Sequence, residues 1–239
     1  MMNKEILLLN GSPRGEKSNT LMAGRAIVEG ITETSGRTCR EIELGRLRIE
    51  ACRGCFSCWR VTPGECVIQD EMREIYEAFD RADIVVVCFP VYFFGLPGPV
   101  KTALDRMLPV MMDYDGGTEL HRVREQYKGK RYLFVSTCGF QSCDGIYDAL
   151  RAQLRGVFGP QTPPLITVPQ AELMRSEPFA PIVNKRLEVL REIGRRFAAD
   201  ELTEEMVVNA ASRLIPKWSY NRIVSSKDLF TGQTTSGKS

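Results

Sequence analysis

The first twenty residues combine a buried strand, a loop rich in hydroxyl groups and the start of a helix. The apolar run at 6–9 ends at Asn10, and the segment 11–20 then brings serine, threonine and asparagine side chains to the start of a helical pattern. Such an arrangement gathers backbone N–H groups and the positive end of a helix dipole at one point, which suits a phosphate. The segment therefore predicts an α/β fold with an anion site at the end of its first strand.

The residue types exclude two common phosphate loops. A nucleoside-triphosphatase loop requires glycine where Glu16 stands, and a dinucleotide loop requires a second glycine where 12–14 read Ser-Pro-Arg. The remaining side-chain donors are Ser12, Ser18, Asn19 and Thr20, with an expected helix N-cap at Asn19 or Thr20. We expect this loop to hold the single monophosphate of a mononucleotide without a metal, and an ordinary strand-to-helix connection is the alternative.

Strand and helix patterns alternate along the first 200 residues. The expected strands are 5–10, 38–44, 84–89, 131–137 and 165–168, and the expected helices are 20–34, 71–81, 100–107, 145–157 and 182–198. Alternation implies right-handed crossovers, and the apolar run at 84–87 is typical of a central buried strand. We predict a three-layer, doubly wound, five-stranded parallel sheet of order 2-1-3-4-5, with ligands beyond the carboxyl ends of its strands.

Two further loops are expected at that edge of the sheet. The segment 90–99 combines aromatic side chains with glycine and proline, and Tyr92 and Phe93 are candidates for stacking on a flat ring. Packing of these aromatic side chains in the core is the alternative. The second loop, 136–140, follows the fourth strand. In the helix after 90–99, Asp105 and Arg106 are expected on the surface.

Four cysteines share one turn-rich stretch, which we call the cysteine loop (51–67). Cys52, Cys55, Cys58 and Cys66 form a C-x2-C-x2-C-x7-C pattern, which is closer to iron–sulfur ligation than to zinc ligation. We favour a [4Fe–4S] cluster, and zinc, free thiols and a redox disulfide remain alternatives. We interpret three other cysteines as core or surface thiols, namely Cys39, Cys88 and Cys143. The single histidine, His121, is interpreted as a solvated loop residue.

Composition limits the class of protein. The 239 residues suit one α/β domain with an extension, and a net charge of +2 with interspersed signs provides no cationic face for nucleic acid. Glycine and proline interrupt the longest apolar stretch, so we expect no membrane span. Without a signal peptide pattern, the expected location is the cytoplasm, where thiols stay reduced.

The motifs together resemble those of the flavodoxin-like NAD(P)H-dependent FMN reductases. The segment 11–20 is similar to their G-S-x-R…S-N-T loop, 90–106 to their second flavin loop and following helix, and 136–140 to their S-T-C-G turn. The cysteine loop resembles that of the iron–sulfur flavoprotein branch. The resemblance implies FMN bound by Ser12, Arg14, Ser18, Asn19, Thr20, Pro90, Val91, Tyr92, Phe93, Phe94, Gly95, Thr137, Cys138 and Gly139, and a possible cluster on the four cysteines of the loop.

The resemblance also implies an activity. The expected enzyme transfers hydride from NAD(P)H to FMN and passes electrons to a quinone, free flavin or iron–sulfur centre, as a homodimer or homotetramer. The alternatives are an electron carrier supplied by ferredoxin and a binding module that has lost its flavin.

The chain is expected to divide into an FMN-binding domain at 1–200 and a C-terminal extension at 201–239. The tail at 231–239 is small and polar and is expected to be disordered. The extension contains Trp218, Tyr220 and Phe230, which either cover a subunit partner or pack back on their own domain.

Overall fold

A computed structural model of the chain describes residues 5–111 and 123–226. Its strands are β1 (Glu5–Asn10), β2 (Thr38–Glu43), β3 (Ala82–Pro90), β4 (Arg131–Thr137) and β5 (Leu165–Val168). They form one sheet of order β2-β1-β3-β4-β5, in which every neighbouring pair is parallel. The predicted doubly wound, flavodoxin-like topology is therefore confirmed.

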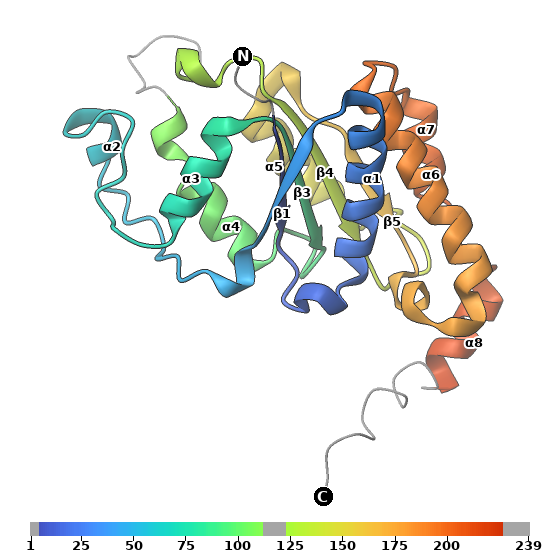
Figure 1. Ribbon diagram of the computed structural model, residues 1–239. Coiled ribbons are helices and arrows are strands. Elements are labelled where there is room, and N and C mark those ends of the chain that lie inside the picture. Colours follow the sequence, from blue (N-terminus) through green and yellow to red (C-terminus); the bar gives the residue numbers. More distant parts are fainter. Residues whose placement is uncertain (1–4, 112–122, 227–239) are drawn as a thin grey trace, which may run out of the picture.

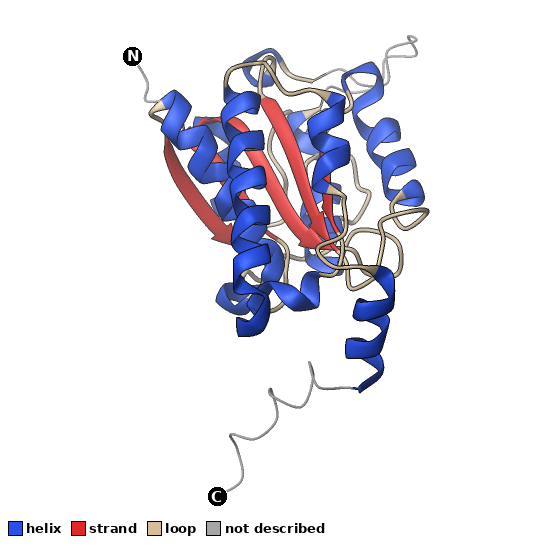
Figure 2. Ribbon diagram, turned by 90° about the vertical axis from the view of Figure 1, so that its right-hand side faces the viewer, coloured by secondary structure: helices blue, strands red, loops and turns tan. Residues whose placement is uncertain are grey.

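Helices cover both faces of this sheet (Figures 1 and 2). The five predicted helices are α1 (Asn19–Ser35), α3 (Met72–Arg81), α4 (Gly98–Asp105), α5 (Asp148–Phe158) and α6 (Ala180–Ala198), with bounds within three residues of those expected. Three further α-helices of the described chain were not predicted, namely α2 (Ser57–Arg60), α7 (Glu204–Ala210) and α8 (Lys217–Ser226). The first of these lies in the cysteine loop, and the other two lie in the C-terminal extension.

The apolar strand residues divide between the two faces by alternation. Ile6 and Leu8 belong to the core under α1 and α6, whereas Leu7 and Leu9 belong to the core under α3, α4 and α5. This division follows from the two-residue period of a strand. A strand buried on both faces needs a continuous apolar run, which explains why the run at 84–87 correctly indicated the central strand.

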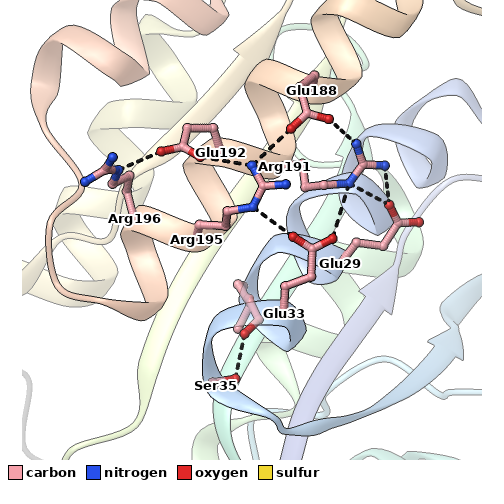
Figure 3. A network of polar contacts seen from close by, with 9 residues as sticks. Glu29, Glu33, Ser35, Glu188, Arg191, Glu192, Arg195 and Arg196 are labelled. Atoms are coloured by element: carbon pink, nitrogen blue, oxygen red, sulfur yellow. Dashed lines mark hydrogen bonds and ion pairs between the residues drawn. The ribbon is translucent and has the colours of Figure 1, made fainter.

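Helices α1 and α6 lie unusually close together. A Cβ atom on Gly30 would stand 1.9 Å from the carbonyl oxygen of Arg191, and one on Gly194 would stand 2.0 Å from the carbonyl oxygen of Ile27. Figure 3 shows the ion pairs that flank this contact, including Arg191 to Glu29 at 2.6 Å. These pairs are solvent-exposed and contribute little individually, so the close backbone contact fixes how α6 lies on α1.

The C-terminal extension packs on its own domain through Tyr220. This side chain is 3% exposed and packs with Leu173 and Ile215, whereas Trp218 on the same helix is 72% exposed. Phe230 and the tail at 231–239 lie outside the described residues. Within the described ranges, none of the helices combines the length and apolar character that a membrane span requires.

Candidate functional site

Three loops meet at the carboxyl edge of the sheet. Gly11, after β1, donates its N–H to the carbonyl of Cys88 at 2.8 Å, and Val91, after β3, donates to the carbonyl of Thr137 at 3.0 Å. Cys138, after β4, donates to the carbonyl of Val168 at 3.0 Å. Each loop is thus bonded to a neighbouring strand, so the three predicted ligand loops form one continuous surface.

Helix α1 begins with a phosphate-sized group of donors. Ser18 has an extended backbone, and its Oγ accepts the N–H of Leu21 at 3.0 Å, so Ser18 is the N-cap and the predicted cap at Asn19 or Thr20 is wrong. Asn19 and Thr20 are the first two helical residues, where N–H groups have no acceptor within the helix. Neither N–H has a partner among the described residues. Both remain available to an anion at the positive end of the dipole.

The hydroxyl groups near these amides are buried and held in place. The Ser12 hydroxyl accepts the N–H of Arg14 at 3.4 Å, and the hydroxyls of Thr20 and Thr137 are hydrogen-bonded to each other. Thr20 therefore ties the first loop to the third. The Nδ2 atom of Asn10 is buried without a partner in the described structure. Buried donors around one loop suit the phosphate of a mononucleotide.

Charges around this loop are arranged to accept an anion. The Glu16 carboxylate is held by both terminal nitrogens of Arg25 at 2.7 Å, and these hydrogen bonds lower the pKa of Glu16. Arg175 donates to the carbonyls of Glu16 and Ser18 at 2.7 and 3.3 Å. Arg14 is exposed and forms no ion pair with any described residue. No local sequence pattern points to Arg175, because Ser18, whose carbonyl it binds, lies 157 residues away in the chain.

The second loop presents aromatic rings to solvent. Tyr92 and Gly95 exchange backbone hydrogen bonds, and the two residues between them, Phe93 and Phe94, both have positive φ angles of 50° and 64°. Such a turn favours asparagine and glycine, so two phenylalanines there are strained. Phe93 is fully exposed, and the ring of Phe94 stacks on Phe140 with centroids 6.3 Å apart. We call Tyr92, Phe93, Phe94 and Phe140 the aromatic rim.

The exposure of Tyr92, Phe93 and Phe94 shows that these rings do not pack in the core. Pro90, Val91 and Gly95, which flank them, are half-buried. An exposed group of aromatic rings beside buried hydrogen-bond donors is suited to a flat, partly polar ligand.

The third loop offers one backbone donor. The carbonyl of Cys138 accepts the N–H of Ala171 at 3.0 Å. Because this peptide bond is trans, the N–H of Gly139 points away from Ala171, and it has no partner in the described structure. Cys138 itself is buried, and a hydrogen bond from Cys143 lowers the pKa of its thiol. The loop thus presents the Gly139 amide, rather than the Cys138 sulfur, at the surface.

The four cysteines of the cysteine loop line a single hollow of about 20 Å³, which is room for about one water molecule. Burial raises the pKa of the Cys58 thiol, and the neighbouring sulfurs of Cys66, Cys55 and Cys52 add to this effect. All eight cysteines are free thiols. Across the described ranges, no three His, Cys, Asp or Glu side chains stand close enough together to hold a metal ion. Four thiols around one hollow are the ligands that an iron–sulfur cluster requires. Their sulfur atoms are farther apart than in a formed cluster site.

The base of the cysteine loop is closed by Arg106, which was predicted wrongly to lie on the helix surface. Its side chain is 1% exposed and pairs with the Asp70 carboxylate at 2.7 Å. It also donates to the carbonyls of Glu50 at 2.8 Å and Ile68 at 3.4 Å. One guanidinium therefore joins the residues that precede the loop to those that follow it. Asp105 does lie on the surface, paired with Lys101.

We expect acid to weaken this closure. Burial opposes ionisation of Asp70, but hydrogen bonds from Arg106 and from the N–H groups of Glu50 and Met72 outweigh it, so the pKa of Asp70 is lowered. A lowered carboxyl pKa stabilises the fold above the unfolded-state value, and this contribution is lost as the pH falls through the folded value, below about pH 4. Urea unfolding between neutral and acid pH measures the effect. Asp70→Asn should be less stable than the wild type at neutral pH, and its free energy of unfolding should fall less on acidification. Equal falls in the two proteins would contradict the role given to the Asp70 carboxylate.

Among the remaining candidates, Cys143 contacts the third loop through its hydrogen bond to Cys138. Cys39 is exposed on β2 and Cys88 is buried in β3, in keeping with surface and core thiols, and Cys143 is half-buried. His121 lies outside the described residues.

The chain is similar to curated proteins with two kinds of name. An "Iron-sulfur flavoprotein" of Archaeoglobus fulgidus is 34% identical over 99 residues, which are 41% of this chain and 43% of that protein. The "FMN-dependent NAD(P)H:quinone oxidoreductase 1" of Pseudomonas aeruginosa is 26% identical over 148 residues, 56% of this chain and 68% of that protein. The chain spans about half the length of the iron–sulfur flavoproteins it matches.

The fold comparison and the family comparison agree. A solved NAD(P)H:quinone oxidoreductase from Methanothermobacter marburgensis has a TM-score of 0.58 at 19% identity, covering 81% of this chain and 97% of that one. The family described as NADPH-dependent FMN reductase matches residues 5–172, which include β1 to β5 and all three loops. The chain therefore belongs to the NADPH-dependent FMN reductase family.

Proposed function

We propose that the protein is an FMN-dependent oxidoreductase that uses NADH or NADPH. The observation that carries the proposal is the set of unpaired N–H groups at Asn19 and Thr20, beside the buried hydroxyl of Ser18, where the three loops meet. This set suits one phosphate on a mononucleotide. When bound, FMN accepts hydride from a nicotinamide nucleotide and passes the electrons to an acceptor.

Each loop has a separate role in the proposed site. The amides of Asn19 and Thr20 bind the phosphate, and Arg175 keeps the loop closed through the carbonyls of Glu16 and Ser18. The aromatic rim holds the isoalloxazine ring and limits its access to water, and the Gly139 N–H donates to the polar edge of that ring.

The proposed electron acceptor is a quinone. Support comes from the relative named FMN-dependent NAD(P)H:quinone oxidoreductase and from the exposed aromatic rim, which offers a flat apolar surface to a second ring. Free flavin and a bound iron–sulfur centre are the other acceptors that an assay must compare.

Flavin titration tests the phosphate site. Ser18→Ala should weaken FMN binding about tenfold, because it removes a hydroxyl donor and the cap that orders the first turn of α1. Ser35→Ala is a matched control, since Ser35 donates to Ile31 at the opposite end of the same helix. Quenching of flavin fluorescence measures both affinities. Equal affinities of the two variants, or a wild-type protein that quenches nothing, would contradict the proposed site.

Rapid mixing of the FMN-loaded protein with NADH or NADPH under anaerobic conditions tests the activity. The absorbance of the oxidised flavin should disappear with at least one nucleotide, and adding a quinone should restore it. A flavin that dithionite reduces but neither nucleotide does would show that the protein is no NAD(P)H oxidoreductase.

A second candidate function is that of an iron–sulfur flavoprotein electron carrier, which receives single electrons from a donor such as ferredoxin. The observation that favours it is the hollow lined by four cysteines and closed by Arg106. Cys52, Cys55, Cys58 and Cys66 would hold a [4Fe–4S] cluster, which supplies one-electron transfer when bound. Iron and acid-labile sulfide in anaerobically purified protein distinguish this function from a flavin-only reductase.

A further inference from the structure

The C-terminal segment contacts the third loop through the side chain of Tyr220. Its hydroxyl lies 2.6 Å from the carbonyl oxygen of Gly139 and 2.7 Å from Oε2 of Glu172. The family match ends at residue 172, so Tyr220 comes from a part of the chain that this match does not include. Arg213, from the same segment, donates to the carbonyl of Gln141 at 3.2 Å. Two residues of the extension therefore bind the carbonyls that follow Cys138.

Gln170 joins this segment to the third loop from the other side. Its Oε1 accepts the N–H groups of Leu214 and Ile215 at 2.7 and 2.9 Å, and its Nε2 donates to the carbonyl of Ile215 at 3.0 Å. Its own N–H donates to the carbonyl of Phe140 at 2.9 Å. Gln170 is fully buried and has a left-handed backbone, φ 57°, which a glutamine adopts only when its surroundings hold it there.

Glu172 occupies the place that a side chain at position 139 would need. A Cβ atom on Gly139 would stand 1.9 Å from Oε1 of Glu172. A phenol has one hydrogen, so it donates to one oxygen at a time. Tyr220 therefore shares its single hydrogen between the carbonyl of Gly139 and Oε2 of Glu172.

We propose that residues 213–220 form part of the flavin site, as a clamp that fixes the third loop. Tyr220 and Gln170 are positioning residues: they hold the carbonyls of Gly139 and Phe140, so that the Gly139 N–H stays directed outward toward the ring edge. This inference rests on the proposed FMN site. A fixed donor at the polar edge of the ring stabilises the reduced flavin and raises its midpoint potential.

Tyr220→Phe tests the clamp by removing a single oxygen. The dissociation constant of FMN should rise about fivefold, as for one net hydrogen bond, and the midpoint potential of bound FMN should become more negative. Glu172→Gln should keep near wild-type values, because its amide donates to the phenol oxygen and leaves the phenol to Gly139. Trp218→Ala, an exposed change on the same helix, should alter neither quantity.

The outcomes separate this inference from the function on which it rests. A wild-type protein that binds no FMN refutes the proposed function. If the wild type binds FMN and Tyr220→Phe keeps both its affinity and its potential, the clamp is refuted and the proposed function stands. If Tyr220→Phe is poorly folded by thermal unfolding, Arg213→Met decides, because it removes the other hydrogen bond from this segment to the loop. A more negative potential in Arg213→Met supports the clamp, and an unchanged one overturns it.

Discussion

Replacing Cys58 with serine is expected to remove essentially all iron from the protein. If the hollow holds a [4Fe–4S] cluster, anaerobically purified wild type should carry about four iron atoms and four sulfides per chain. Cys58 is the buried member of the four, with the other three sulfurs near it, and a serine hydroxyl is a poor ligand for iron. Cys58→Ser should therefore lose both the metal and its visible absorption.

Cys39→Ser is the matched control for this experiment, because Cys39 is an exposed thiol on β2 outside the cysteine loop. It should keep the full iron and sulfide content. A wild type without iron, or one that holds zinc, would show that the cluster hypothesis is wrong. A Cys58→Ser variant with unchanged iron would instead remove Cys58 from the ligand set.

Arg106→Met is expected to cost about 3–5 kcal/mol of unfolding free energy, the usual result of leaving a buried charge without its partner. The carboxylate of Asp70, whose side chain is 9% exposed, would keep only its backbone hydrogen bonds, from Glu50 and Met72. Urea unfolding of the metal-free protein measures this loss of unfolding free energy, so that a bound cluster cannot contribute to it. Because Arg106 joins the two ends of the cysteine loop, the variant should also bind iron poorly.

Lys101→Met provides the control, since it breaks an exposed ion pair to Asp105 on the same helix. It should change the free energy of unfolding by no more than about 0.5 kcal/mol. The double variant Arg106→Met, Asp70→Leu should recover part of the loss, because both buried charges are then absent. Equal effects of Arg106→Met and Lys101→Met would refute the closing role of Arg106.

The sequence predicted the sheet well because its signals are local. β1, β4 and β5 begin and end at the expected residues, where apolar runs meet turn residues. The alternation of strands with helices indicated a parallel sheet, and five strands suggested the flavodoxin-like order that the structure shows. Contacts across the chain explain the errors. Asn19 was a candidate N-cap, but its side chain instead donates to the carbonyl of Ala171 at 2.7 Å, which leaves the cap to Ser18.

The candidate sites show the same limit. Loop residues such as Ser12 and Phe93 were found because their types and spacing are characteristic, whereas Arg106, Arg175 and Tyr220 were not. Each of these three side chains binds a residue at least 36 positions away in the chain. Its partner is a carbonyl or a carboxylate, and such groups are too common in any sequence to single out one pair. Their roles follow only from the packed structure, and the FMN and metal ligands themselves remain predictions.

Helix α4 gives the two candidate redox sites a common support. It starts three residues after Gly95, which closes the turn of the aromatic rim, and it ends immediately before Arg106 at the cysteine hollow. Its eight residues span about 12 Å. The length of this helix sets the spacing between the residues at its two ends. A flavin at one end and a metal cluster at the other would therefore exchange electrons over a distance that a single helix determines.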